Sequence, residues 1–146
     1  MDIILCGQAF HWFDRQKSKI EFARILTKEG NIVLVWNERS IKNNFQKEYE
    51  KLLFDNIEEY KILNHRNINP ELIADFFSPK KLNKFSLENK QTLSFAGLVG
   101  RLRSSSYFPK SGAQHDKIIS DLRLLFQKYK EEETVVFEYE TKVYWC

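Results

Sequence analysis

Two short apolar runs separated by a helical pattern constrain the fold more than any other feature of this sequence. Ile3–Gly7 and Asn31–Trp36 are nearly continuous apolar runs, which is typical of strands buried on both faces of a parallel sheet. Between them, Asp14 can cap a helix that ends before Gly30. The apolar stripe expected on this helix consists of Ile20, Phe22, Ala23, Ile25 and Leu26. A strand, a helix and a second strand in this order predict a βαβ unit with parallel strands.

The remainder of the chain predicts further helices and two more strands. Apolar residues three or four apart around Tyr49, and an Asn69-Pro70 cap signature before residues 71–77, indicate helices that form a lid. Phe85–Leu93 partly alternates and is expected to be a strand, followed by a short helix over residues 95–102. Arg103–Pro109 is expected to be a loop, because serine and proline interrupt the pattern.

The last third of the sequence predicts one long helix and one exposed strand. The helix carries an amphipathic stripe made of Ile118, Ile119, Leu122, Leu125, Phe126 and Tyr129. Thr134–Trp145 alternates between apolar and charged residues, as a half-exposed antiparallel strand does. The predicted fold class is therefore α/β, with four mixed strands, an antiparallel last strand, helices on both faces and a helical lid.

Composition excludes several classes of function. A chain of 146 residues suits one domain with one core, and 42% apolar residues are typical of a globular protein. The net charge of +3 is spread along the chain, so nucleic acid is not an expected partner. The apolar run near Met1 is too short for a signal peptide or a membrane span. Cys6 and Cys146 form neither a disulfide framework nor a zinc pattern, so we expect a cytoplasmic protein without metal.

Three segments in the first quarter of the chain resemble a known enzyme family. They are Cys6–Asp14 (Cys-Gly-Gln-Ala-Phe-His-Trp-Phe-Asp), Phe22–Leu26 and Gly30–Asn37. They resemble the middle of class I, Rossmann-like, S-adenosylmethionine-dependent methyltransferases, in particular the small-molecule branch with the trans-aconitate and ubiquinone-type enzymes. In that branch a strand ends in Gln-Ala-x-His-Trp-Phe, a helix carries Arg-x-Leu, and a glycine precedes the next strand. Asn89–Ser94, Gly100–Pro109 and Thr141–Tyr144 are also similar to the family.

The family's cofactor motif has no counterpart in these residues. In the family, a Gly-x-Gly-x-Gly turn approaches the cofactor, and an acidic residue after the second strand binds the ribose. No two of the five glycines here are separated by a single residue, so the sequence contains no Gly-x-Gly. The resemblance begins at the family's fourth strand and implies that residues 1–146 are the C-terminal half of a methyltransferase domain, without the cofactor-binding half. The isolated chain is then expected to bind no S-adenosylmethionine and to be inactive.

The resemblance also implies two groups of site residues. Gln8, Ala9, His11 and Trp12 follow the first strand and correspond to the segment that lines the methionine side of the cofactor. Candidate residues for binding a small-molecule substrate are Trp36, Asn37, Arg39, Arg101, Arg103, Ser105 and Tyr107. Arginines suit a carboxylate, because a guanidinium meets it with two hydrogen bonds. No residue is assigned a catalytic role, because methyl transfer needs mainly alignment of the reactants.

Each of these assignments has a competing interpretation. Trp12 and Phe13 can pack the helix against the sheet, with His11 hydrogen-bonded locally. The arginines can be solvated charges in a serine-rich loop, or, less favoured, Tyr107 and Phe108 can stack RNA bases. For the whole chain, the alternative function is a non-enzymatic remnant or partner-binding module without cofactor.

The first strand is expected to mediate association. In the intact family fold its neighbour on one side belongs to the half that is absent here, and no proline or lysine between Asp2 and Gln8 blunts the open edge. We therefore predict a homodimer in which two Ile3–Gly7 strands meet antiparallel about a two-fold axis. A separate N-terminal half would compete for the same edge.

Overall fold

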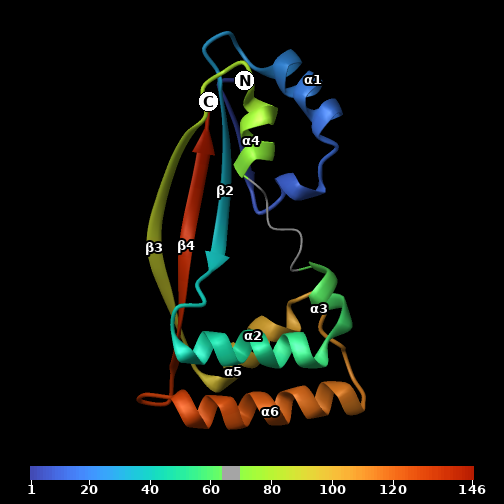
Figure 1. Ribbon diagram of the computed structural model, residues 1–146, viewed down its shortest axis with the longest axis vertical. Coiled ribbons are helices and arrows are strands. Elements are labelled where there is room, and N and C mark those ends of the chain that lie inside the picture. The colour runs from blue at the N-terminus through green and yellow to red at the C-terminus, as the bar shows by residue number, and fades with distance from the viewer. Residues whose placement is uncertain (64–69) are drawn as a thin grey trace. The chain divides into compact units, whose positions relative to one another are not determined.

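The computed structural model describes residues 1–63 and 70–146, which form two compact units (Figure 1). Unit 1 contains Met1–Glu38, residues 70–88 and Glu140–Cys146, and unit 2 contains residues 39–63 and Asn89–Tyr139. Each unit has its own buried cluster, so the expectation of a single core is wrong. The reason is that the last strand runs through both units and contributes different residues to the two clusters.

One sheet of four strands has the order β1-β2-β4-β3. Its strands are β1 (Ile3–Gly7), β2 (Asn31–Arg39), β3 (Asn83–Leu93) and β4 (Val135–Trp145). β1 and β2 are parallel, with the register running from Ile3 opposite Asn31 to Gly7 opposite Val35. This confirms the predicted parallel pair.

β4 is antiparallel to β2 and lies between β2 and β3. The backbones of Ile32 and Cys146 exchange two hydrogen bonds of 3.3 Å, and the Ser40 N–H donates to the Glu138 carbonyl at 2.9 Å. Partner numbers therefore fall as residue numbers rise, which defines an antiparallel pair. The structure confirms the mixed four-stranded sheet and the insertion of the last strand between the two before it.

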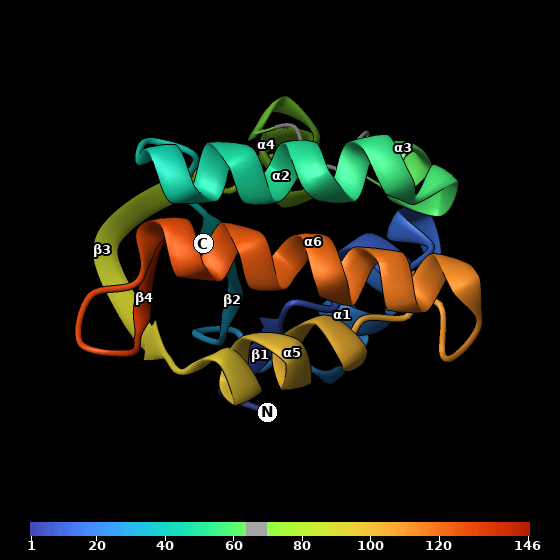
Figure 2. The ribbon, with the colours of Figure 1, turned by 90° about the horizontal axis from the view of Figure 1, so that it is seen from below.

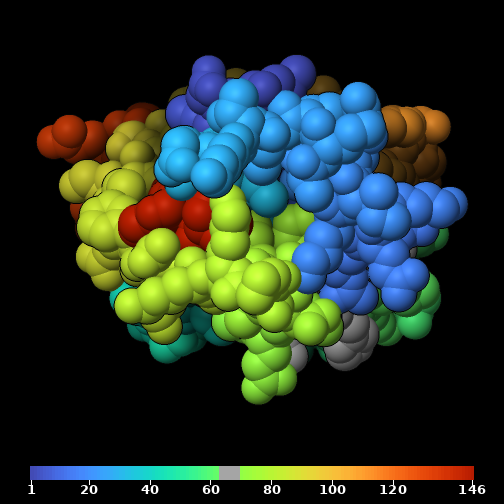
Figure 3. Space-filling model, turned by 90° about the horizontal axis from the view of Figure 1, so that it is seen from above, coloured from blue at the N-terminus to red at the C-terminus, as the bar shows by residue number. Residues whose placement is uncertain are grey.

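Unit 1 packs two helices against sheet residues. They are α1 (Arg15–Ile25) and α4 (Pro70–Phe77), which lie side by side when seen from above, and a short 3-10 turn, η1 (Phe10–Trp12), precedes α1 (Figure 3). The core consists of Cys6, Phe10, Phe22, Leu34, Trp36, Ile73, Phe76, Phe77 and Tyr144. The rings of Phe22 and Phe76 are 5.9 Å apart, so aromatic contacts join the two helices.

The start of α1 agrees with the sequence analysis, but its apolar stripe does not. Asp14 Oδ1 accepts a hydrogen bond of 3.1 Å from the Lys17 N–H and caps the helix as predicted. Phe22 is buried, whereas Ile20 is 71% exposed and Ala23 is also exposed. Residues two positions apart on a helix are rotated by about 200° about its axis, so Ile20 and Phe22 lie on opposite sides. The predicted Asn69 cap of α4 lies outside the described residues.

Unit 2 is built mainly from helices. They are α2 (Asn44–Asn56), α3 (Glu58–Leu63), α5 (Phe95–Arg103) and α6 (Ala113–Tyr129), and α2 and α6 lie side by side (Figure 2). Leu53 of α2, Leu122 of α6 and Phe137 of β4 are fully buried. The buried Gln46 side chain donates to the Glu138 carbonyl and accepts from the Glu138 N–H, both at 2.9 Å, so it extends the hydrogen bonding of β4. That these helices form a lid stays a prediction.

Along residues 1–63 and 70–146, no helix combines the length and apolar character that a membrane span requires.

Candidate cofactor and substrate site

The turn after β1 holds one of the residues expected at the cofactor. Gln8 has a φ of 53°, which is a left-handed backbone conformation that few residues other than glycine adopt. Its N–H donates to the Val35 carbonyl at 2.9 Å, and its side-chain amide donates to the Asn37 carbonyl at 3.1 Å. These bonds hold the strained turn and bring Gln8 to Asn37, where the adjacent strand β2 nears its end. Two residues predicted for different parts of the site therefore lie together.

The residues after Gln8 divide between the core and the surface. Ala9 is half-buried, and its carbonyl accepts a hydrogen bond of 2.9 Å from the Trp12 N–H. Phe10 is 3% exposed, and its ring lies 4.6 Å from that of Phe76. His11 is exposed, Trp12 is 67% exposed, and their rings are 4.9 Å apart. The interpretation in which Trp12 and Phe13 pack the helix against the sheet is therefore wrong for Trp12, because Phe10 takes that position, whereas the Phe13 ring does lie 6.3 Å from that of Phe22 on α1.

Trp36, predicted to bind substrate, lies in the core of unit 1. It is 6% exposed, and its ring lies 6.3 Å from that of Phe10 and 5.9 Å from that of Tyr144. Its indole N–H has no hydrogen-bond acceptor within the described part of the chain. Its packing is what the structure shows, and its contact with a substrate stays a prediction.

Arg39, at the end of β2, is already paired within unit 2. Its Nη2 lies 3.0 Å from Glu50 Oε1 and donates to the Tyr60 hydroxyl at 2.6 Å. The Tyr60 hydroxyl in turn donates to Glu50. The side chains of Arg39 and Glu50 are only 19% and 21% exposed. Burial acts to lower the pKa of Arg39, but the charge of Glu50 and the neighbouring tyrosines raise that pKa above its ordinary value.

Arg101, on α5, has a different environment. It is half-buried, and the centre of its guanidinium lies 4.9 Å from the Phe137 ring and 5.2 Å from the Tyr139 ring. Within the described ranges, no carboxylate lies at ion-pair distance from it. Burial raises the pKa of Tyr139, although Arg101 and Arg39 oppose this. Arg101 is therefore held by aromatic faces and not by an acid.

The remaining predicted residues separate into two places. Arg103 is exposed at the end of α5, and its Nη2 is 3.5 Å from His115 Nε2. Because it is two residues from Arg101 on one helix, it points to the opposite side. Ser105 closes the turn after α5, with its N–H donating to the Leu102 carbonyl at 3.1 Å. The Tyr107 ring lies 5.0 Å from the Tyr60 ring, which links it to Arg39.

Four residues that contact Arg39 or Arg101 were not predicted to be site residues. They are Tyr49, Glu50, Tyr60 and Tyr139. The only signal was helical spacing: Glu50 follows the core position Tyr49, and such a side chain is expected to be solvated. The partner of Glu50 comes from a strand, so local spacing could not reveal the pair.

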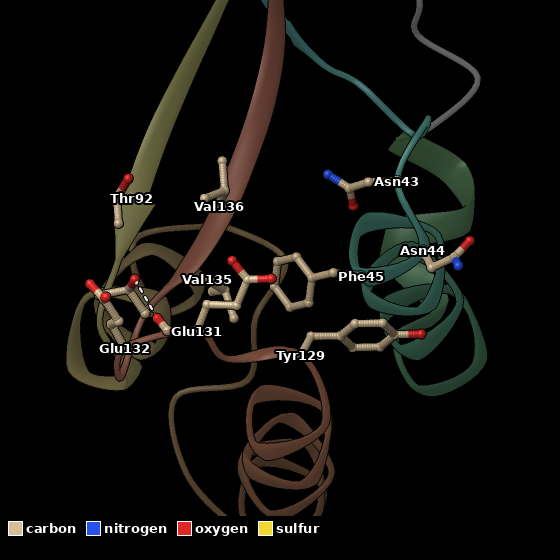
Figure 4. Close-up of a pocket in the computed structure, with 10 residues that line it drawn as sticks. Asn43, Asn44, Phe45, Thr92, Tyr129, Glu131, Glu132, Val135 and Val136 are labelled. Carbon is tan, nitrogen blue, oxygen red and sulfur yellow. Dashed lines mark hydrogen bonds between the residues drawn. The ribbon is translucent and has the colours of Figure 1, made fainter.

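Unit 2 also contains an open hollow of about 670 Å³ (Figure 4). It is lined by Asn43, Asn44, Phe45, Thr92, Tyr129, Glu131, Glu132, Thr134, Val135 and Val136. None of the predicted site residues lines it. Among the residues that the structure describes, no group of three or more His, Cys, Asp or Glu is arranged to hold a metal ion.

Comparisons with known proteins agree with the fold. The chain is 41% identical over 39 residues to the uncharacterized methyltransferase C25B8.09, and 44% identical over 39 residues to the uncharacterized methyltransferase-like C25B8.10, both from Schizosaccharomyces pombe. Each match covers 27% of this chain, and 16% and 15% of the two yeast proteins. No protein-family model matches the sequence.

A solved structure covers almost the whole chain. A candidate type II methyltransferase from Anaeromyxobacter dehalogenans aligns with 99% of this chain at a TM-score of 0.60 and 16% identity. The alignment covers 63% of that protein, so this chain spans less than two thirds of its relative's length. The chain therefore has a class I methyltransferase fold, with the open mixed sheet of that class.

Proposed function

We propose that this chain is part of an S-adenosylmethionine-dependent methyltransferase that acts on a small molecule. The observation that carries the proposal is the turn after β1, where Gln8 is held in a left-handed conformation and bonded to the Asn37 carbonyl. This turn presents His11 and Trp12 to solvent beyond the carboxyl end of a parallel strand. Ligands of open α/β sheets bind at that end. An exposed tryptophan beside a histidine suits ligand contact better than it suits packing.

The residues present fit only one side of the cofactor. The resemblance implies that Gln8, Ala9, His11 and Trp12 line the methionine side of S-adenosylmethionine. For the ribose and the adenine, the 146 residues supply no Gly-x-Gly pair. We propose that this chain alone binds no cofactor and transfers no methyl group.

Calorimetry tests both parts of this proposal. The 146-residue chain titrated with S-adenosylmethionine should give no binding heat, and micromolar binding would contradict the claim that the chain alone binds no cofactor. A chimaera should bind if the N-terminal segment of the A. dehalogenans protein precedes Met1. In the chimaera, Trp12→Ala should weaken binding about tenfold or more, whereas Phe54→Ala, a change at an exposed position of unit 2, should not. A folded, monodisperse chimaera without cofactor binding would overturn the methyltransferase proposal.

The partner-binding alternative is favoured by β1. This strand is at the outer edge of the described sheet, and Ile3 and Leu5 are 62% and 66% exposed. We propose that two β1 strands pair antiparallel in a homodimer, or that a separate N-terminal half occupies the same edge.

The direction of the β1 backbone groups gives a selective test. The Asp2 carbonyl and the Gln8 N–H both bond to β2. The backbone N–H and C=O groups of even-numbered β1 residues therefore face β2, and those of odd-numbered residues, including the Leu5 N–H, face the open edge. Leu5→Pro should therefore convert a dimer to a monomer in light scattering while the circular dichroism stays unchanged. Ile4→Pro, which removes a donor facing β2, should instead destabilise the strand pair. A monodisperse wild-type monomer at micromolar concentration would refute the homodimer.

We also propose a cytoplasmic location. Cys6 and Cys146 are both free thiols, which is typical of a reducing compartment. Fractionation of cells that express the chain would test this, and recovery outside the cytoplasm would contradict it.

A further inference from the structure

We propose that Arg101 binds an oxyanion group of the substrate, while Arg39 only shapes the site. The proposal rests on the proposed function and assigns its substrate to the class of small molecules that carry a carboxylate or a phosphate. It follows from the different partners of two guanidinium groups in one half-buried cluster of unit 2.

The charges of this cluster do not balance. Arg39 and Arg101 supply two positive charges, and Glu50 is the acid that the described residues place beside either of them. Glu50 is fully engaged, since it pairs with Arg39 at 3.0 Å and accepts from Tyr60. One positive charge is left, and its neighbours are tyrosine and phenylalanine rings. An incompletely hydrated charge without a counter-ion is costly, so an anion that binds there is stabilised.

The position of Arg101 leaves its hydrogen-bond donors available. The guanidinium lies over the rings of Phe137 and Tyr139, which are 0% and 4% exposed. A cation–π contact places the charge over the face of an aromatic ring and uses none of the five N–H donors of the guanidinium for a hydrogen bond. Within the ranges that the structure describes, none of these N–H groups has an acceptor. A planar fork held in place in this way suits the two oxygens of a carboxylate or phosphate.

Arg39 cannot take the same role without loss of its own contacts. Its guanidinium is bonded to Glu50 and Tyr60 and lies 5.5 Å from the Tyr49 ring. A substrate anion would have to displace the Glu50 carboxylate. Arg39 is therefore a positioning residue that keeps Glu50 away from Arg101 and holds the side chains of Tyr49 and Tyr60 in place.

Arg123 supplies a matched control. Its guanidinium also lies over an aromatic ring, 4.2 Å from the ring of Phe95, and belongs to the same unit. It is exposed on α6, where bulk water solvates the charge. If stacked arginines bound anions without further requirements, Arg101 and Arg123 would respond alike.

The test is a titration of the full chain at constant ionic strength with succinate, with inorganic phosphate and with neutral succinamide. Nuclear magnetic resonance of the arginine Nε–H groups is the readout. We expect a saturable shift of the Arg101 signal with succinate or phosphate, none with succinamide, and none at Arg123. The stronger of the two anions then identifies the group. Arg101→Met should abolish the shifts of neighbouring residues, Arg101→Lys should weaken binding about tenfold because the fork is lost, and Arg123→Met should change nothing.

The outcomes separate this proposal from the methyltransferase proposal. No saturable shift with either anion, equal shifts at Arg123, or binding that survives in a folded Arg101→Met variant would each overturn the anion site. If succinate or phosphate binds through Arg101 but the chimaera with the N-terminal segment binds no S-adenosylmethionine, the anion site stands and the methyltransferase proposal fails. If the chimaera binds S-adenosylmethionine and neither anion binds, only the anion site is lost.

Discussion

The two units differ in where their exposed apolar side chains lie. Unit 1 exposes apolar side chains on helices too, such as Ile20 of α1, but its strands also carry them: Ile3 and Leu5 of β1 and Phe85 of β3 are 62%, 66% and 58% exposed. In unit 2, Phe54 and Leu124 are exposed on the outer sides of helices. Scattered apolar residues on helices are ordinary, whereas bare apolar strands are sites of pairing. Unit 1 thus has the more exposed apolar strand residues, and these are the residues on which the proposed pairing of β1 with another chain depends.

The units also differ in their charges. Unit 2 holds the half-buried pair of Arg39 and Glu50. In unit 1, the pairs Asp14 with Lys17 and Glu21 with Arg24 are exposed, and the pair of Glu38 with Lys142 is more exposed than that of Arg39 with Glu50, at 40% and 30%. Exposed ion pairs contribute little to the free energy of unfolding, whereas a half-buried ion pair constrains which side chains fit around it. The loss of an ion-pair partner should therefore cost most at the Arg39–Glu50 pair of unit 2.

The largest expected effect is the loss of a buried side chain in unit 2. Leu122, on α6, is 0% exposed, so Leu122→Ala should lower the free energy of unfolding by about 2–5 kcal/mol. Leu124 on the same helix is 69% exposed, so Leu124→Ala should change it by no more than about 0.5 kcal/mol. Urea denaturation followed by circular dichroism measures both. Equal effects would break the view of unit 2 as a closed core.

A smaller effect is expected from the half-buried ion pair. Glu50→Gln should cost about 1–3 kcal/mol of stability, because Arg39 and Tyr60 lose a charged acceptor. Asp55→Asn, on the same helix, removes an exposed pair with Lys51 and should cost less than about 1 kcal/mol. Thermal unfolding of the two variants sharpens the contrast between buried and exposed pairs. A harmless Glu50→Gln would show that Arg39 does not depend on this partner.

The tyrosines of unit 2 predict a loss of stability in alkali. Burial raises the pKa of Tyr49 and of Tyr60 well above the ordinary value, although the Arg39 charge opposes this. In the unfolded chain, tyrosines have a pKa of about 10, so at higher pH the unfolded state loses its tyrosine protons before the folded state does. The stabilising contribution is complete below about pH 10 and is lost as the pH rises toward the folded pKa values. Tyrosinate absorbance should therefore rise together with loss of the circular dichroism signal, and Tyr60→Phe should make that loss shallower.

The smallest effect compares equivalent helix caps in the two units. Asp14 caps α1 and Ser94 caps α5, so Asp14→Ala and Ser94→Ala should each cost about 1 kcal/mol. If unit 1 is the less stable unit, Asp14→Ala should speed amide hydrogen exchange only around α1, whereas Ser94→Ala should affect much of unit 2. Global acceleration by Asp14→Ala would argue that the units unfold together.

Local patterns predicted most elements, and long-range contacts account for the differences. Ile3–Gly7 was predicted with the bounds of β1, because a short apolar run that ends in glycine needs no distant information. The helix after Leu93 runs to Arg103, one residue beyond the prediction, and this is why Arg101 and Arg103 point apart.

The candidate site was harder to predict from sequence. Phe10 and Trp12 are both aromatic and two residues apart, and only the packing of Phe76 from a distant helix decides which is buried. The pairing of Arg39 with Glu50 depends likewise on how a strand meets a helix. Residue types and spacing do not contain this information.

The place of β4 between β2 and β3 has a consequence for how fast the chain can fold. Asn37 and Thr141 bond at 3.0 Å, and Glu38 pairs with Lys142, although each pair is 104 residues apart in the chain. The pairing of such distant residues requires closure of a long loop, and the entropy cost of that closure comes before any strand contact stabilises the chain. Folding is therefore slow. Until β4 arrives, the inner edges of β2 and β3 both remain unpaired. Synthesis of the chain therefore passes through a stage with two open strand edges, when aggregation competes most strongly with folding.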